Sequence, residues 1–293
     1  MYDMKALYEA ESVDHALALM QEHPDALVMA GGSDVLIKMR EGKLAGREFV
    51  SIYMLDEMRG ITLTKDGTIR IGSLTSFSHV IRSEIVQQHI PVLAEAISMI
   101  GGPQVRNIGT IGGNTCNGVT SADSGATLMA LDAEVELRGP EGTRVIPLQK
   151  FYIKPGVVDI KRGELQMALL IKKEGYEGYT GHFIKYAMRD AMDIATLGCS
   201  VNVRLSEDKQ TIEDCRVAFG VAGPVPMRLP SAEEVVRGAS ISDDLMHAFA
   251  EATEADVNPR TSWRAKKEFR LHLIKTMAER ALRACITKAG GTI

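Results

Sequence analysis

Two glycine-rich segments contain the residues of this chain that are best suited to bind an anion. The first, AGGSDVLIKMR, covers residues 30–40, and the second, RNIGTIGGN, covers residues 106–114. Glycine has no Cβ, so backbone N–H groups beside it can approach a phosphate closely, above all where a strand turns into a helix. Two such turns from different parts of one domain could hold a pyrophosphate between them.

Neither segment matches a common nucleotide-binding signature, because the chain lacks both GxGxxG and GxxxxGK[ST]. A single Gly-Gly pair after a strand is most often only a tight turn, so Gly31 and Gly32 alone would be interpreted as structural. The second segment differs, because a long polar loop inside a compact domain is usually either functional or disordered. Ile108 and Ile111 favour an anchored loop, and we therefore predict a binding site.

The cysteines and histidines give no sign of a metal centre. Cys116, Cys199, Cys215 and Cys285 are far apart and form no CxxC pair, and the seven histidines form no HExxH motif. This spacing argues against zinc or an iron–sulfur cluster held by this chain alone, so an organic cofactor must carry any redox chemistry. Disulfides stay possible, but without a secretory signal we expect a reducing cytoplasm.

The elements that would position these residues can be predicted from periodicity and caps. Ser12 should cap an amphipathic helix, and residues 26–30 should form a buried strand before the glycine turn and a helix capped by Ser33 or Asp34. Further along we expect a strand over 67–76, a helix from 77, a second helix ending at Gly101, a loop over 106–123, a helix over 125–131, a hairpin turning at 139–142 and a strand over 164–173.

A glycine- and tyrosine-rich stretch, residues 175–181, suggests a domain boundary. Four successive antiparallel strands should follow it, then helices over 232–238, 243–254 and 262–289. The last helix carries Lys266, Lys267, Arg270 and Lys275, which could form a docking face, although a solvated side is the commoner explanation.

The composition fits an ordinary globular protein of about two domains. The chain has 293 residues, 45% hydrophobic and 25% charged, with a net charge of −4. This charge argues against a nucleic-acid binder with a broad basic surface. No segment has the ~18 uninterrupted apolar residues of a membrane span.

The two glycine segments, with Asp123 nine residues beyond Asn114, resemble the paired flavin signatures of the FAD-binding subunits of molybdenum hydroxylases. Two later segments add to the resemblance: FIKYAMRDAMDIA, residues 183–195, and NPRTSWRAKKEFRLHLIKTMAERAL, residues 258–282. The likeness therefore covers nearly the whole chain, and it is strongest to the flavin subunits of bacterial xanthine dehydrogenases. Carbon monoxide dehydrogenases belong to the same group.

The chain departs from the family pattern at a few positions. It has GVTSAD, residues 118–123, where many relatives have Ser-Pro before the aspartate, and Trp263-Arg264 where Tyr-Arg is commoner. The cysteine-bearing insertion of members with an extra four-iron cluster is not visible, so no cluster is assigned.

The resemblance implies an α+β fold. A two-subdomain FAD-binding domain of the vanillyl-alcohol-oxidase/PCMH type would cover residues 1–176, with subdomains over 1–56 and 57–176. A C-terminal domain over 177–293 would consist of an antiparallel sheet with helices.

The resemblance also implies site residues, all for cofactor binding and none for acid–base catalysis. The first pyrophosphate loop would comprise Leu27, Val28, Met29, Ala30, Gly31, Gly32, Ser33 and Asp34, and the second Gly109, Thr110, Ile111, Gly112, Gly113 and Asn114. Asp123 would lie near the ribityl chain or the ring, Leu165 would pack on the cofactor, and Asp193 would belong to a loop that affects access to the flavin.

Lys185 would lie at the flavin and raise its potential. Without the resemblance, these side chains have ordinary explanations. Asp123 would be a surface carboxylate or helix cap, Leu165 strand core and Lys185 a solvated lysine.

The function implied is that of an electron relay. A partner molybdopterin subunit would oxidise a purine, a 2Fe-2S partner would pass electrons to FAD, and NAD⁺ would be the acceptor. Alternatives from the same class are nicotinate, aldehyde, aromatic or carbon monoxide hydroxylases, since the substrate is chosen in another polypeptide. A self-sufficient flavin oxidase or reductase and a non-redox nucleotide-binding module are the remaining readings.

Overall fold

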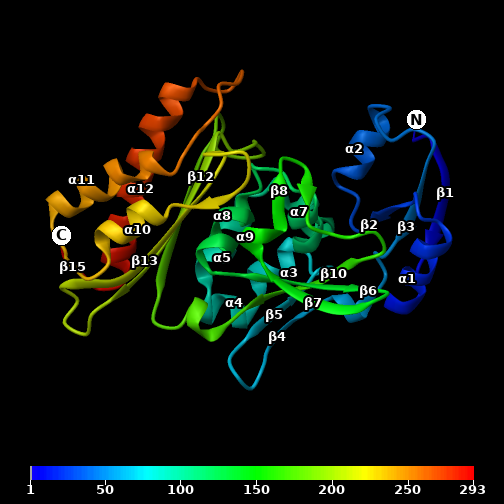
Figure 1. The fold of residues 1–293 in the computed structure, drawn as a ribbon, viewed down its shortest axis with the longest axis horizontal. Helices are drawn as coiled ribbons and strands as arrows, with labels where there is room; N and C mark the ends of the chain where they lie inside the picture. Colours follow the sequence, from blue (N-terminus) through cyan, green and yellow to red (C-terminus); the bar gives the residue numbers. More distant parts are fainter. Residues whose placement is uncertain (1) are drawn as a thin grey trace.

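The computed structural model describes residues 2–293, and the three larger sheets of these residues follow one another along the long axis of the molecule (Figure 1). No helix among these residues has both the length and the apolar character needed to cross a membrane.

The N-terminal sheet is parallel, in the order β1 (Met4–Glu9), β3 (Arg47–Ser51), β2 (Leu27–Met29). Parallel neighbours need crossover connections, and helices α1 (Val13–Glu22) and α2 (Val35–Arg40) lie in them. The predicted N-cap is confirmed, because the Ser12 side chain accepts a hydrogen bond from the His15 N–H group. Strands β1 and β3 were not predicted.

The middle sheet has the order β4-β5-β10-β6-β7 and is antiparallel throughout. Its hairpin turns between Gly139 and Gly142, as predicted. The strands and the short pair beside them are β4 (Ile61–Leu63), β5 (Ile69–Gly72), β6 (Glu134–Gly139), β7 (Gly142–Pro147), β8 (Tyr152–Lys154), β9 (Val157–Val158) and β10 (Leu165–Ile171).

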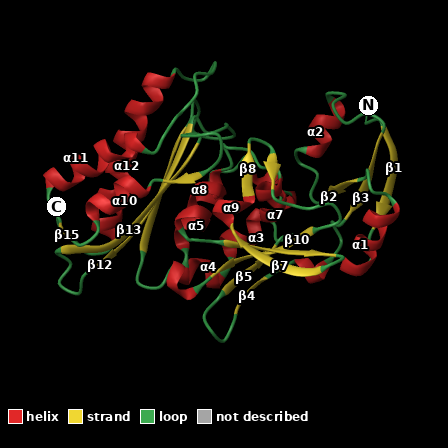
Figure 2. Cartoon of the chain, viewed as in Figure 1, coloured by secondary structure: helices red, strands yellow, loops and turns green. Residues whose placement is uncertain are grey.

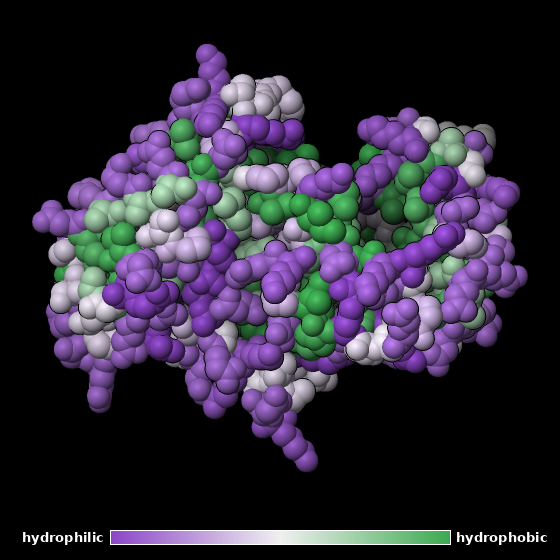
Figure 3. All heavy atoms as spheres, in the orientation of Figure 1, coloured by the Kyte–Doolittle hydropathy of each residue, from purple (hydrophilic) through white to green (hydrophobic). Residues whose placement is uncertain are grey.

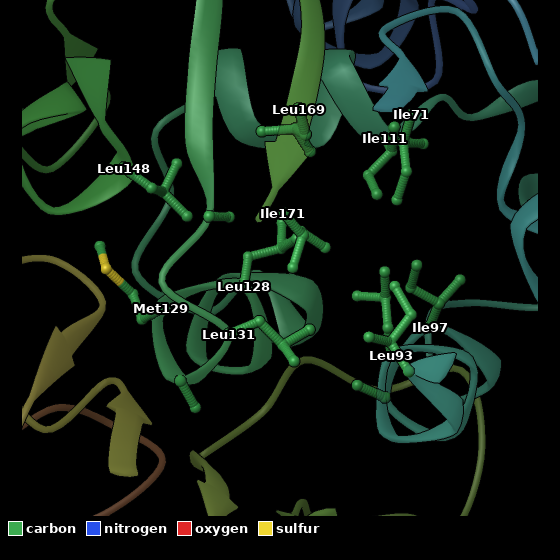
Figure 4. Packing of buried hydrophobic residues seen from close by; sticks show 14 of the residues in the cluster. Ile71, Leu93, Ile97, Ile111, Leu128, Met129, Leu131, Leu148, Leu169 and Ile171 are labelled. Atoms are coloured by element: carbon green, nitrogen blue, oxygen red, sulfur yellow. The ribbon is translucent and has the colours of Figure 1, made fainter. Parts of the chain in front are cut away.

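Helices fill the space between this sheet and the C-terminal part. They are α3 (Phe77–Arg82), α4 (Glu84–His89), α5 (Pro91–Ser98), α6 (Pro103–Ile108), α7 (Ile111–Cys116), α8 (Asp123–Ala130) and α9 (Leu148–Phe151). In the central core, side chains from the sheet, including Ile71 and Leu169, converge with Leu93 of α5 and Leu128 of α8 (Figure 4). The expected loop over 106–123 is wrong in part, because it contains the end of α6 and all of α7.

The C-terminal sheet is antiparallel, as predicted, in the order β11 (Thr180–Tyr186), β12 (Leu197–Leu205), β13 (Thr211–Gly220), β14 (Met227–Arg228), and β15 (Ala239–Ser240) also pairs with β13. Helices α10 (Pro230–Val236) and α12 (Lys267–Lys288) cover one face, and α11 (Asp243–Ala252) packs on both of these helices. The other face packs on α5 and α8, so the sheet lies between two helical layers (Figure 2).

Side-chain alternation along β12 explains how one strand serves both layers. Val201 and Val203 belong to the core shared with α12, whereas Asn202 points the other way and donates to the Ala130 carbonyl oxygen of α8 at 3.1 Å. The last helix begins at Lys267 rather than at the predicted Ser262. Lys266 is extended and the Ser262 hydroxyl accepts the Arg264 N–H group, so residues 262–266 form a turn.

Candidate functional site

The two glycine segments lie in direct contact, although 65 residues separate them in sequence. A Cβ placed on Gly31 would lie 1.9 Å from the carbonyl oxygen of Ile108 and 3.4 Å from the nitrogen of Gly109. Only glycine fits such an approach. The end of α7 makes a second link, because Asn117 donates to the Asp34 carboxylate and accepts from the Lys38 ammonium group at 3.0 Å.

The first segment presents unpaired backbone donors. Strand β2 ends at Met29, Gly32 has a φ of +71°, and the Leu36 N–H group bonds to the Gly32 carbonyl as α2 begins. Within residues 2–293, the N–H groups of positions 31 to 34 donate to no protein acceptor. Consecutive free N–H groups at such a turn are suited to an anion. Asp34 occupies the predicted cap position, but its side chain makes no capping bond.

The second segment differs from the expectation that it offers free N–H groups. It forms α7, capped by the Thr110 hydroxyl, and nearly all its donors already have acceptors. Gly109 donates to Val105 O at 2.7 Å, Ile111 to Thr75 O at 3.0 Å, Gly112 to Ser73 O at 2.9 Å, Gly113 to Thr110 Oγ1 at 3.1 Å and Asn114 to Thr110 O at 3.0 Å. Between positions 109 and 114, only the Thr110 N–H group lacks an acceptor among the described residues.

Gly112 is needed for packing between elements. A Cβ at this position would lie 2.5 Å from the Ser73 Cβ and 2.7 Å from the Ser73 carbonyl oxygen. The glycine therefore allows α7 to sit against the end of β5. This contact, rather than room for a diphosphate, is what a larger residue at 112 would first disturb.

A buried ion pair joins the two halves of the chain near α7. The Lys185 ammonium group of β11 lies 2.7 Å from Asp123 Oδ2, and the two side chains are 7% and 6% exposed. Lys185 also donates to the Met99 carbonyl oxygen at 3.0 Å, so it is not the solvated lysine that its strand alone would suggest. The other carboxylate oxygen, Asp123 Oδ1, is buried without a hydrogen-bond partner among the described residues.

Burial raises the pKa of Asp123 to about 6, and the attraction of Lys185 opposes that rise. The pair is close to the second glycine segment, because the Ser124 hydroxyl, next to Asp123, bonds to the Asn114 side chain at 2.6 Å. The structure thus brings Asp123, Lys185 and both glycine segments into one region.

The buried polar side chains around α7 were not predicted from the sequence. In the part of the chain that the structure describes, Ser73 Oγ and Gln166 Nε2 are buried without a protein partner, while Gln166 Oε1 accepts from Thr115 Oγ1 at 2.9 Å. Ser73 follows β5 directly and lies within the strand predicted over residues 67–76, so the sequence located the segment but not the buried hydroxyl. Gln166 is the one polar residue in the otherwise apolar strand β10, and this contrast was the sequence signal that could have marked it as a candidate site residue.

Leu165 and Asp193 have local structural roles. Leu165 is 3% exposed and belongs to the hydrophobic cluster of the N-terminal part, with Val50 and Leu55, so its burial needs no cofactor. Asp193 accepts N–H groups of its own loop, from Met188 at 2.9 Å and Ile194 at 2.9 Å. Desolvation opposes ionisation there, but these hydrogen bonds prevail and lower the pKa of Asp193.

The surface is hollowed between the N-terminal sheet with α2 and the middle of the molecule (Figure 3). Helix α2, which follows the first glycine turn, stands at one rim of this hollow (Figure 1). A cofactor held by the first turn can therefore reach solvent on this face.

Two family models match the chain in succession. The FAD binding domain in molybdopterin dehydrogenase matches residues 2–171, and the CO dehydrogenase flavoprotein C-terminal domain matches residues 182–285. The predicted boundary at 176/177 falls between the two matches and stays a prediction.

Relatives match over most of their length. The chain is 42% identical to the xanthine dehydrogenase FAD-binding subunit of Escherichia coli O157:H7 over 293 residues, covering 100% of both chains. It is 31% identical to the carbon monoxide dehydrogenase medium chain of Hydrogenophaga pseudoflava over 275 residues, covering 94% of each. A solved carbon monoxide dehydrogenase from Hydrogenophaga pseudoflava superimposes with a TM-score of 0.91 at 29% identity, covering 97% of this chain and 98% of that one.

Proposed function

The chain belongs to the family of FAD-binding subunits of molybdenum hydroxylases, and from this we propose that it carries electrons from a 2Fe-2S partner subunit to NAD⁺ during oxidation of xanthine or hypoxanthine. It is an oxidoreductase subunit of the xanthine dehydrogenase-like kind. The molybdopterin of the assembly would be bound by a further partner subunit. Purine oxidation is preferred because the match to a xanthine dehydrogenase subunit, at 42% identity, exceeds the 31% match to a carbon monoxide dehydrogenase chain.

The observation that carries the proposal is the contact between the two glycine segments. A single diphosphate can be held where the free N–H groups of residues 31–34 stand beside Ile108 and Gly109. The first segment would supply the donors. The second segment would supply the Thr110 N–H group as a further donor. Its backbone, fixed by the hydrogen bonds of α7, would bound the other side of the site.

The Asp123–Lys185 pair suits the ring of a flavin. Within residues 2–293, Asp123 Oδ1 is an unused acceptor, and the ammonium group, which has three hydrogens, makes two hydrogen bonds to protein. An adjacent acceptor and donor complement the pyrimidine edge of the flavin, which offers an N–H group between carbonyl groups. FAD would supply the exchange between one-electron and two-electron transfer, and Lys185 would favour negative charge on the ring.

Asp193 would shape access to the site rather than take part in the reaction. Its carboxylate holds three backbone N–H groups of its own loop, those of Met188, Arg189 and Ile194. We also propose a cytoplasmic location, which agrees with four cysteines that are all free thiols.

An absorbance spectrum of the purified chain tests the cofactor assignment. We expect flavin bands and release of FAD rather than FMN on denaturation. A chain that stays colourless after incubation with FAD, alone and with its partner subunits, would refute the assignment.

The acceptor and the substrate need separate measurements. Anaerobic NADH should bleach the flavin bands if NAD is the acceptor. Persistence of the bands would exclude NAD as the acceptor without contradicting the assignment of FAD as the cofactor. The purified assembly should oxidise hypoxanthine and xanthine faster than nicotinate, aldehydes or carbon monoxide. Faster oxidation of one of those other substrates would instead assign the chain to the corresponding hydroxylase.

A further inference from the structure

The first glycine turn carries a negative charge at a place where an anion would bind. The N–H groups of residues 31–34 are free of protein acceptors within residues 2–293, and the last of them belongs to Asp34. An anion bonded to the Asp34 N–H group would lie only a few ångströms from the Asp34 carboxylate, because one residue carries both groups. A like charge at ~5 Å weakens anion binding on the order of tenfold at low salt. The turn therefore needs a charge that offsets this carboxylate.

The Asn117 side chain connects the Asp34 carboxylate to a cation. Its Nδ2 donates to Asp34 Oδ2, and its Oδ1 accepts from the Lys38 ammonium group at 3.0 Å. Asp34 and Lys38 stand one helical turn apart, since the Lys38 N–H group donates to the Asp34 carbonyl oxygen at 3.1 Å. One amide group thus joins a negative and a positive side chain on the same face of α2.

Other cations near the two glycine segments have different partners or directions. Arg106 donates to two carbonyl oxygens just after α5, at 2.9 and 3.0 Å. Lys43 pairs with a neighbouring carboxylate at 2.7 Å. Arg40 stands six residues after Asp34, which on a helix of about 3.6 residues per turn is another face. Lys38 is the cation that the structure connects to the acidic residue of the turn.

The same hydrogen bonds link the two glycine segments. Asp34 lies where α2 begins and Asn117 where α7 ends, and the two residues are 83 positions apart in sequence. The carboxylate therefore helps to hold α2, at the rim of the hollow in Figure 1, against the second segment. Asp34 and Lys38 are exposed, so their effect on a bound anion should depend on salt.

We propose that Lys38, positioned by Asn117, offsets the charge of Asp34 and so allows the first glycine turn to bind the diphosphate of the cofactor. This inference rests on the proposed function, which supplies the diphosphate. Lys38 is a positioning residue, because it acts on the cofactor through the charge of Asp34 and takes no part in electron transfer. Without its ammonium group the carboxylate would remain at the turn and repel the diphosphate.

The test uses the purified, FAD-free full chain, with the dissociation constant for FAD measured by flavin fluorescence at low and moderate salt. The variants are Lys38→Met, which keeps the side-chain length without the charge, and the double variant Asp34→Asn/Lys38→Met. The control is Lys43→Met, which removes the same charge from an exposed lysine after α2 that makes no contact with Asn117. Urea unfolding of each variant monitors the fold.

We expect Lys38→Met to raise the dissociation constant for FAD at least about fivefold at low salt and less at moderate salt, while Lys43→Met changes it less than about twofold. The double variant should return to within about twofold of the wild type, because the carboxylate that Lys38 offsets is then gone. Lost packing at position 38 would not be reversed by an isosteric change at position 34, so this recovery separates charge from a merely structural role.

Equal dissociation constants for Lys38→Met and Lys43→Met would overturn the proposal. So would a double variant that binds FAD as weakly as Lys38→Met does. The failure of the proposed function is distinguishable from these outcomes, because the wild-type chain itself would then bind no FAD. In that case both the proposed function and the role of Lys38 would be refuted, whereas tight FAD binding by the wild type and Lys38→Met alike would refute the role of Lys38 alone.

Discussion

At the scale of single residues, Asp123 has the most unusual environment in the candidate site. One of its oxygens pairs with Lys185, and the other is buried without a partner within residues 2–293. A cofactor that donates to the free oxygen would satisfy it. Nothing in the local sequence GVTSAD indicates this burial, because Asp123 begins α8 and the lysine lies 62 residues away on β11.

This environment predicts a pH dependence for the FAD-free chain. Burial raises the pKa of Asp123 to about 6 from an ordinary value of 3.8, so between these pH values the folded chain binds more protons than the unfolded chain. The contribution of Asp123 to the free energy of unfolding is therefore fully present below about pH 4 and is lost as pH rises through about 6, by at most about 3 kcal/mol. Urea unfolding at several pH values would show this loss in the wild type and its absence in Asp123→Asn. Parallel curves for the two proteins would contradict it.

At the scale of elements, the site depends on the fit between the first glycine turn and the end of α6. We predict that Gly31→Ala lowers the free energy of unfolding by about 1–3 kcal/mol and reduces FAD retention, because the methyl group would overlap the Ile108 carbonyl oxygen. The flavin-to-protein absorbance ratio and urea unfolding measure both effects. Gly198→Ala is the control, since a Cβ there would meet the Phe183 ring at an ordinary 3.5 Å. Equal losses in the two variants would show that the close approach is not the cause.

Elements specified by local signals were predictable. The Ser12 cap, the turn between Gly139 and Gly142 and the successive strands after residue 180 depend on neighbours in sequence. The predicted fold, an α+β chain with a two-subdomain PCMH-type FAD domain and a C-terminal antiparallel sheet with helices, is confirmed by the matching solved structures.

The missed elements depend on distant partners. Helix α7 has the sequence IGGNTC, which is a poor helix former, and it is held by hydrogen bonds to Ser73 and Thr75. Among the described residues, strand β1 pairs only with β3, and α1, β2 and α2 lie between them in sequence, so no turn signal marks β1. The contact between Gly31 and Ile108 could not be derived from the spacing of either segment.

At the scale of the whole molecule, the C-terminal sheet shares its core with the part before it. Phe183 and Ala218 belong to the central hydrophobic cluster, and polar contacts reinforce the joint: Asp132 pairs with Arg216 at 3.2 Å, and the Glu95 carboxylate lies 2.9 Å from the His182 ring. Neither part would keep its apolar surface covered without the other. We therefore expect them to unfold together.

Thiol labelling along a urea gradient tests this cooperativity. Cys116 lies in α7, and Cys199, Cys215 and Cys285 are buried in the core between the C-terminal sheet and α12. Mass spectrometry of the labelled peptides should give the same midpoint for Cys116 and Cys285. Two separated midpoints would show that the parts unfold independently.

The ion pair between Asp123 and Lys185 crosses this joint at the place assigned to the flavin ring. Binding of FAD and opening of the joint between the C-terminal sheet and the part before it are consequently linked equilibria, and thermodynamic linkage is reciprocal. A substitution that fully opens the Glu95–His182 contact should raise the dissociation constant for FAD by the same factor by which bound FAD suppresses opening of that contact.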